Sequence, residues 1–572
     1  MSKARTVALA LSATVSACAT GLGPIRPDAY ADARAHSIFV DGDGRPLRPD
    51  TIHAATIVGS STHGDSAYGE WIHGILMGLA ASGRHDVLLR IHGGVTPLNL
   101  VAGDTALTAR IMRESPYYPI YINWESSIQA SYLDQLFYVR DGRAYRGWDA
   151  RGVWLSPLYL ASDAGRAIAR APVTWSVQAR KFIGELHSSD GIVSASAKRD
   201  QSLLFSSAAT TGSTNRCAPN AKPLASESTV RIEYGPDCRR AWERALDVGL
   251  AVATTVGVLP YDRRAGRIGH NTVGRMSLKL PSHLFWPSAK LFSPWATHHI
   301  AWLPLRPISS LVIDMVGSPS YLNMHRRTKT MFRPSPERAR AGAGPLSYNP
   351  ASGGVAELLD SLQAFVAQTG DTARPSRCSW SASGDAVARA AGEPYRVTIV
   401  GASLGANIAT EIVRGCPGIS FTNIVFLGAA ASERDVEQGI VPYLRADTTA
   451  RFFNLTLNPA ADRDEWPAGL FFSTQGSLVE WLDGFMTTPE TDEDRVFGKY
   501  ENAMSAIHLL PQSIRRRVFY KSFGYYSAFG NFGVPYRHAD LALGPFWKCE
   551  YWMPAVAKAE CAAPAAAGPG GR

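Results

Sequence analysis

A short run of small residues between an apolar strand and a helix constrains this chain more than any other feature. Residues 397–400 are β-branched and mostly apolar, and a helix begins near residue 405, so the chain must turn sharply between them. The turn reads Gly401-Ala402-Ser403-Leu404-Gly405, a Gly-x-Ser-x-Gly pattern. Such an elbow strains the backbone of its serine and needs small neighbours. We predict that Ser403 Oγ projects from the sheet, with the Leu404 N–H beside it as an oxyanion donor.

The elbow and its flanking strands resemble the α/β-hydrolase superfamily. The resemblance covers residues of about 85–125 and 390–550, and the middle of the chain matches no family that we can name. It implies an α/β fold with a mostly parallel central sheet flanked by helices. The elbow lies about 310 residues after the turn at 92–94, which lies in the first part of the chain to show the resemblance. The resemblance therefore also implies a large inserted cap.

The first matching turn follows a buried-type strand at 86–91 and reads His92-Gly93-Gly94. In the superfamily a turn of this kind resembles the oxyanion-hole loop, because glycines let backbone N–H groups approach without a Cβ in the way. We expect Gly93 and Gly94 to hold the oxyanion with Leu404, and His92 to brace the turn. The next strand, 117–124, comes in the order that the superfamily requires.

The superfamily order of serine, acid and histidine directs the search for the other catalytic groups. Asp462 follows a strand at 451–457 most closely and is our chosen acid; Asp464 and Asp435 are the alternatives. His538 lies on a loop ahead of an aromatic closing segment and is our chosen base. His508 is its rival, but it stands in an apolar run that is typical of a core histidine.

The N-terminus has the pattern of an exported chain. Lys3 and Arg5 precede an apolar stretch at 6–15 that is too short to span a bilayer. The following Val15-Ser16-Ala17-Cys18 resembles a bacterial lipobox, which implies lipidation of Cys18 and an outer-membrane anchor facing the periplasm. An ordinary signal peptide, giving a soluble periplasmic or secreted protein, is the alternative.

Six cysteines remain besides Cys18, an even number that favours disulfides in an exported chain. Six cysteines allow 15 connectivities. Nearness in sequence suggests Cys217 with Cys238 and Cys549 with Cys561, which leaves Cys378 with Cys416 as the remaining pair.

These features divide the chain of 572 residues into six parts. We predict a signal peptide at 1–17, a linker with an exposed hairpin at 18–50, hydrolase core at 51–125, the inserted cap at 126–350, hydrolase core at 351–555, and a disordered tail at 556–572.

Composition narrows the function classes. The net charge of +9 is spread along the chain without a basic stripe, so a nucleic-acid partner is not expected. No cysteine or histidine spacing indicates a metal site, and no cofactor is expected. We expect a serine hydrolase of small-molecule or lipid esters, with a membrane contact through the lipid anchor. A non-catalytic binding or scaffold lipoprotein and an acyltransferase using the same serine are the alternatives.

Overall fold

The computed structural model describes residues 27–42, 44, 46–47, 65–137, 139–140, 143–144, 150–187, 231–233, 306–332, 353–366, 378, 395–457, 462, 465, 476–487, 492–506, 510–523, 535, 537–553 and 561. Several predicted features therefore lie outside the described residues: the signal peptide at 1–17, Cys18, Cys217, Cys238, Asp464, His508 and most of the tail at 556–572.

The described elements alternate between strands and helices along most of the chain. The strands are β1 (Ser37–Val40), β2 (Pro46–Leu47), β3 (Asp86–Ile91), β4 (Tyr117–Trp124), β5 (Val139–Arg140), β6 (Arg143–Ala144), β7 (Arg231–Glu233), β8 (Arg396–Ala402), β9 (Phe421–Leu427), β10 (Arg451–Leu457) and β11 (Val518–Phe523). The longer helices are α2 (Pro27–His36), α4 (Asp65–Ala81), α5 (Leu98–Ile111), α6 (Ile128–Phe137), α7 (Ala150–His187), α12 (Arg306–Thr330), α14 (Gly354–Val366) and α15 (Gly405–Gly415). The shorter ones are α16 (Glu433–Asp435), α17 (Val441–Ala446), α19 (Leu478–Trp481), α20 (Tyr500–Ser505), α21 (Gln512–Arg515), α22 (His538–Leu543) and α23 (Cys549–Trp552), with 3-10 turns at Met112–Glu114 and Asp492–Asp494 and π-turns at Val436–Ile440 and Leu482–Met486.

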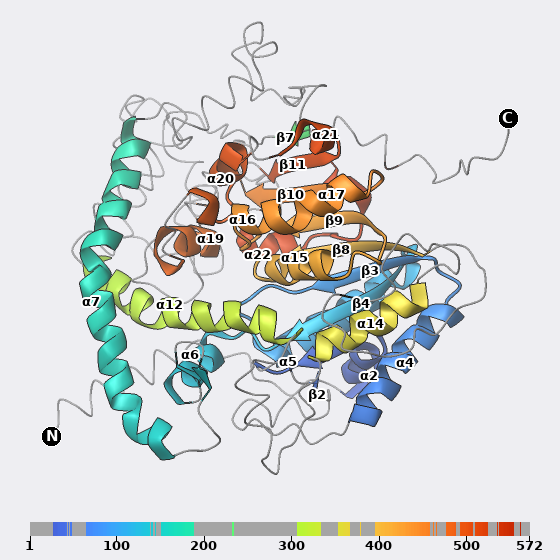
Figure 1. The fold of residues 1–572 in the computed structure, drawn as a ribbon, viewed down its shortest axis with the longest axis horizontal. Helices are drawn as coiled ribbons and strands as arrows, with labels where there is room; N and C mark the ends of the chain where they lie inside the picture. The colour runs from blue at the N-terminus through green and yellow to red at the C-terminus, as the bar shows by residue number, and fades with distance from the viewer. Residues whose placement is uncertain are drawn as a thin grey trace, which may run out of the picture.

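Nine strands form one sheet in the order β2-β1-β4-β3-β8-β9-β10-β11-β7 (Figure 1). Every neighbouring pair is parallel except β1 with β2. Parallel pairing explains why the central strands are buried along nearly their whole length, since helices cover both faces of such a sheet. The expected α/β class with a mostly parallel, helix-flanked sheet is confirmed.

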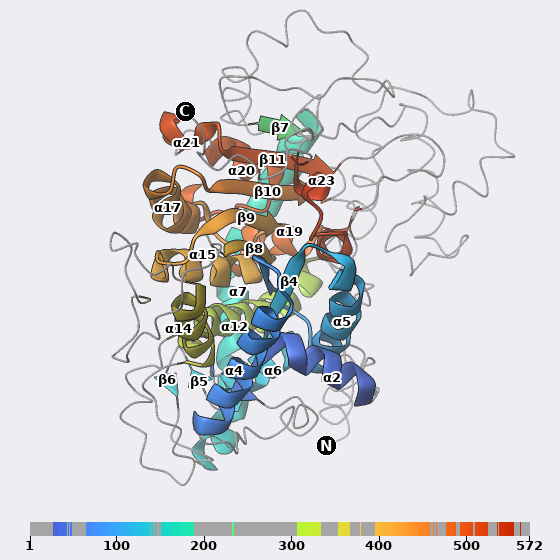
Figure 2. The same ribbon diagram turned by 90° about the vertical axis from the view of Figure 1, so that its right-hand side faces the viewer.

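The two faces of the sheet carry separate apolar layers. Seen along the sheet, α14, α15 and α17 lie on one side, and α5 and α23 lie on the other (Figure 2). Alternate side chains of β3 show the division, because Leu89 packs in one layer and Leu88 in the other. The sheet is therefore a rigid support whose strand ends can position a site.

In the expected linker at 18–50 the hairpin is present, as β1 with β2, but it is largely buried, and a helix, α2, precedes it. Residues 37–40 form β1, which pairs in parallel with β4 and is fully buried, and β2 pairs with β1. The proline and glycine pattern correctly indicated a turn at 41–44. It did not indicate the strand at 37–40, Ser-Ile-Phe-Val, which extends the sheet. A four-residue strand has too little periodicity to stand out in sequence.

The segment at 126–350, predicted as a cap, contributes to the main sheet as well as to separate helices. Its β7 pairs in parallel with β11 and forms the edge of the sheet. Its α12 packs against α6, α7 and α15. Figure 1 shows α7 standing at the outer edge of the molecule, with α12 running from it toward the sheet.

Arg327 fastens α12 to the segment that follows β4. Its side chain is fully buried and donates to the Glu125 carbonyl at 2.8 Å and to Ser131 Oγ at 3.0 Å. The same guanidinium pairs with Asp134. A buried guanidinium with a carboxylate and two further acceptors is well compensated for its lost hydration, so this contact fixes the returning helix of the insertion against the core.

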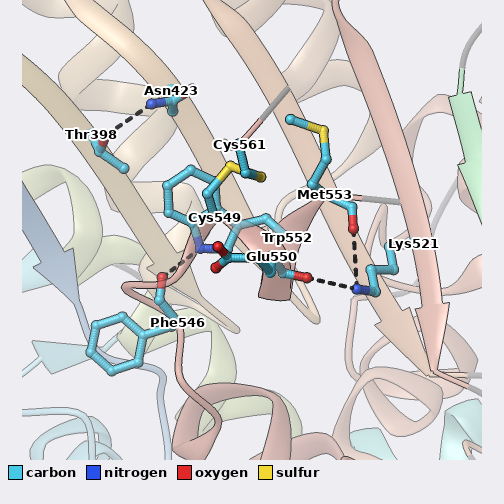
Figure 3. Close-up of a disulfide and its surroundings, with 9 residues drawn as sticks. All are labelled: Thr398, Asn423, Lys521, Phe546, Cys549, Glu550, Trp552, Met553 and Cys561. Atoms are coloured by element: carbon cyan, nitrogen blue, oxygen red, sulfur yellow. Dashed lines mark hydrogen bonds between the residues drawn. A yellow bond between two sulfur atoms is a disulfide. The ribbon is translucent and has the colours of Figure 1, made fainter. Parts of the chain in front are cut away.

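Two disulfides join residues of the described structure, and both join cysteines that were paired in the sequence prediction. Cys378–Cys416 fastens the end of α15, and Cys549–Cys561 begins at α23. Beside the second bond, the Lys521 ammonium of β11 donates to the carbonyls of Glu550 and Met553 at 3.3 and 3.2 Å (Figure 3). Disulfides are compatible with an extracytoplasmic location.

Among the described helices, none combines the length and the apolar composition that a bilayer-crossing helix needs.

Candidate active site

Ser403 stands where β8 meets α15, in a backbone conformation that few residues other than glycine adopt. Its φ is +49°, in the left-handed region, which costs a non-glycine residue about 1–3 kcal/mol. The residue is 6% exposed, and its Oγ has no hydrogen-bond partner within the described residues. The expected strained elbow is therefore confirmed, and it presents a hydroxyl that is not used in holding the fold together.

The His92-Gly93-Gly94 turn lies directly against this elbow. A Cβ built on Gly93 would be 3.0 Å from Ser403 Cβ and 3.3 Å from the Ala402 carbonyl oxygen. Such contacts are tighter than ordinary Cβ contacts, so glycine lets the backbone approach the serine without displacing its neighbours. The N–H groups of Gly93, Gly94 and Leu404 have no hydrogen-bond acceptor within the described residues. They are the donors that the sequence predicted for an oxyanion.

His92 braces the turn, as expected. Its Nε2 accepts from the Trp124 N–H at 3.0 Å, so the proton is on Nδ1, which donates to the Gly93 carbonyl at 2.6 Å. Burial lowers the pKa of His92 to about 3, which keeps the ring neutral with this donor and acceptor arrangement. Ser126 Oγ adds contacts to the carbonyls of Gly93 and Thr96 at 3.2 and 3.0 Å.

The position of the turn and the elbow follows from the sheet topology. The strands β3 and β8 are neighbours in the sheet. The strand that follows β3 in the chain, β4, lies on one side of this pair, and the strand that follows β8, β9, lies on the other side. Such a reversal leaves a crevice outside the carboxyl ends of the two strands, and ligands bind at these crevices in open α/β sheets. Gly93 follows the end of β3 and Ser403 follows the end of β8.

His538 comes to the neighbouring strand end. It is the first residue of α22 rather than a loop residue, and its ring lies over Gly428, which directly follows β9. A Cβ on Gly428 would be 2.7 Å from both Nδ1 and Cε1 of the ring, and Gly428 itself has φ +55°. The preceding residue, Leu427, accepts the Ser403 N–H through its carbonyl at 2.9 Å. The serine and the histidine thus flank the same turn after β9.

The imidazole of His538 is available for chemistry. Its Nδ1 is buried and has no hydrogen-bond partner within the described residues. Burial lowers the pKa of His538 to about 4, so the ring is neutral at physiological pH and can accept a proton. No hydrogen bond joins Ser403 Oγ to this ring among the described residues; the two residues both contact the turn that follows β9 without being linked to each other.

The three candidate acids have different surroundings. Asp462 is 1% exposed, and its carbonyl accepts the Ser477 N–H at 2.7 Å. Asp435 instead caps α16, because its carboxylate accepts from the N–H and the hydroxyl of Ser432, both at 2.9 Å. Asp464 lies outside the described residues. The geometry therefore gives Asp435 a structural role and leaves Asp462 as the buried carboxyl.

Glu465 is a site residue that the sequence analysis missed. Its carboxylate accepts the backbone N–H of His538 at 2.7 Å, which ties the segment containing Asp462 to the start of α22. Sequence gave no signal for this contact, because the two residues are 73 positions apart and a loop glutamate is usually solvated.

No protein-family model, curated protein or solved structure matches this chain. The fold and the geometry of the site define an α/β protein with a strained serine and a neutral histidine near the carboxyl ends of neighbouring parallel strands.

Exchange of Gly93 for alanine tests the close approach of the turn to Ser403. The new Cβ would meet Ser403 Cβ and the Ala402 carbonyl at 3.0 and 3.3 Å, so the turn has to move away from the elbow. We expect any Ser403-dependent reaction to slow by about 10²-fold, the usual effect of losing one oxyanion donor. Gly103→Ala on α5 is the matched control, since its Cβ meets nothing within 4 Å. Equal losses in both variants, or none in Gly93→Ala, would contradict this geometry.

The lowered pKa of His538 predicts how stability changes with pH. The folded state favours the neutral ring, so this contribution is complete above pH 6.5, the ordinary histidine value, and is lost as pH falls toward about 4. We expect the free energy of unfolding of the wild type to fall by about 3 kcal/mol more than that of His538→Gln across this window. Urea unfolding at several pH values measures the difference. His73→Gln, on an exposed part of α4, is the control. Parallel curves for wild type and His538→Gln would refute the prediction.

Proposed function

We propose that the protein is a serine hydrolase that cleaves carboxylic esters through an acyl-enzyme intermediate. The observation that carries the proposal is the left-handed backbone of Ser403 at the end of β8, beside a glycine turn whose N–H groups have no acceptor among the described residues. Strain of this kind persists where the surrounding structure maintains it, and it clusters at functional sites. The strand order, with the elbow on the strand next to β3, also supports the α/β-hydrolase resemblance.

Each residue has a defined role in the proposed reaction. Ser403 Oγ attacks the ester carbonyl while His538 takes the hydroxyl proton, and His538 then returns that proton to the leaving alcohol. Water, activated by the same ring, releases the acid and restores the serine. Asp462 orients the imidazole and stabilises its charged form. The N–H groups of Leu404, Gly93 and Gly94 bind the oxyanion, each for about 3 kcal/mol.

The proposal extends to location. The lipobox-like sequence ending at Cys18 supports a lipid-anchored protein at the outer membrane, facing the periplasm. Labelling with radioactive palmitate, compared with a Cys18→Ala variant, tests the anchor.

Fluorophosphonate labelling tests the nucleophile directly. The wild type should be labelled at Ser403, as mapped by mass spectrometry, and should hydrolyse short-chain aryl esters; Ser403→Ala should lose both properties. Ser522→Ala is a matched control, because Ser522 Oγ on β11 is also buried without a partner among the described residues. An unlabelled wild type would favour the binding or scaffold alternative. Transfer of the acyl group to an added alcohol in preference to water would identify an acyltransferase.

The acid is tested by exchanging Asp462 and Asp435 for asparagine. Asp462→Asn should lower kcat by about 10²- to 10⁴-fold, since a triad acid fixes the tautomer of its histidine. Asp435→Asn should keep kcat within about threefold and should lower stability by about 1 kcal/mol, because it weakens the cap of α16. Ester-hydrolysis kinetics and thermal unfolding separate the two effects. The reverse pattern would assign the acid to Asp435.

A further inference from the structure

Arg90 is a buried cation that the proposed reaction does not use. It lies on β3, three residues before Gly93, and is 4% exposed. Burial lowers the pKa of its guanidinium, although the group stays charged. A charge removed from water in this way is costly unless nearby groups compensate it. Its contacts therefore indicate what the residue does.

The contacts of Arg90 lead from β3 to the segment that carries the histidine. Its guanidinium donates to the Ala542 carbonyl in the last turn of α22 at 3.0 Å, and it lies 3.9 Å from the centre of the Phe546 ring. The Asp104 carboxylate is 3.5 Å away and 39% exposed, and Thr108 Oγ1 is at 3.4 Å. The shortest polar contact is thus to α22, while the ion pair is longer and partly hydrated.

The helix α22 depends on such contacts for its place. It has only six residues, far fewer than a helix needs to be stable alone. Its last-turn carbonyls are satisfied from outside, Ala542 by Arg90 and Leu541 by the Tyr551 hydroxyl at 3.0 Å. At its other end, Glu465 holds the His538 N–H. Loss of one anchor would let the helix, and the ring at its start, move away from Gly428.

We propose that Arg90 is a positioning residue that sets the distance between the histidine of α22 and the oxyanion turn that follows β3. The inference rests on the proposed function for its catalytic meaning. The Arg90 side chain joins two segments that lie 452 positions apart in the sequence. One of them carries the proposed general base, and the other carries the proposed oxyanion donors. Arg90 touches neither substrate nor the reacting atoms in this scheme; it acts through His538.

The test compares Arg90→Met, Arg90→Lys and the wild type by two independent measurements. The first is the pKa of His538 from an NMR titration, which needs no activity. Arg90→Met should raise it from about 4 toward the ordinary value of 6.5, because a displaced α22 admits water to the ring. The second is the rate of fluorophosphonate labelling of Ser403 at pH 7, which should fall at least tenfold. Arg90→Lys keeps the charge but cannot reach all the same partners, and should lie between the other two in both measurements.

Arg113→Met is the matched control, since this arginine lies at the surface beyond α5 and pairs with Asp32. It should leave both measurements unchanged. If Arg90→Met fails to fold, Arg90→Lys decides: a wild-type His538 pKa together with a wild-type labelling rate in that variant would overturn the proposal. A wild type that is never labelled would refute the serine-hydrolase function instead, and the His538 titration would still decide the role of Arg90.

Discussion

The left-handed backbone of Ser403 is the constraint on which the candidate site depends. Three backbone hydrogen bonds hold it in place. Its N–H donates to the Leu427 carbonyl at 2.9 Å, and its carbonyl accepts from Ala406 and Ala430, both at 3.0 Å. Hydrogen bonds of about 1 kcal/mol each are of the size needed to offset the strain. Because the same bonds fix the end of β9, they also fix Gly428, over which the His538 ring lies.

The structure was most predictable from sequence where the pattern of a short stretch of chain and its place in the fold require the same conformation. The strands at 86–91, 117–124 and 451–457 have the predicted bounds, because apolar runs bounded by clear breakers leave little choice of limits. The elbow and the bracing role of His92 were also predictable, since both follow from a short stretch of chain. Both described disulfides match the expected pairing: Cys549–Cys561 was paired by nearness in sequence, and Cys378–Cys416 as the pair that remained.

Features that depend on distant contacts were not predictable in this way. The place of β1 beside β4 and of β7 beside β11 depends on register across the sheet, and strands of four and three residues carry almost no pattern. His538 was expected on a loop, but it begins α22, which is held by Arg90 and Glu465 from far along the chain. Such anchoring contacts involve single polar residues that look solvated in sequence.

The pairing of β3 with β8 has a consequence for how the molecule is made. The Asp86–Arg396 ion pair at the start of these strands joins residues separated by 310 positions. Loop-closure entropy grows only with the logarithm of loop length, so the insertion between the strands costs the finished fold little, about 0.6 kcal/mol for each doubling. The effect on the folding rate is greater, because pairing between strands that are far apart in sequence slows folding. The glycine turn emerges early in synthesis and the serine late, so the candidate site of a nascent chain stays incomplete until the last third of the chain is available to close the centre of the sheet.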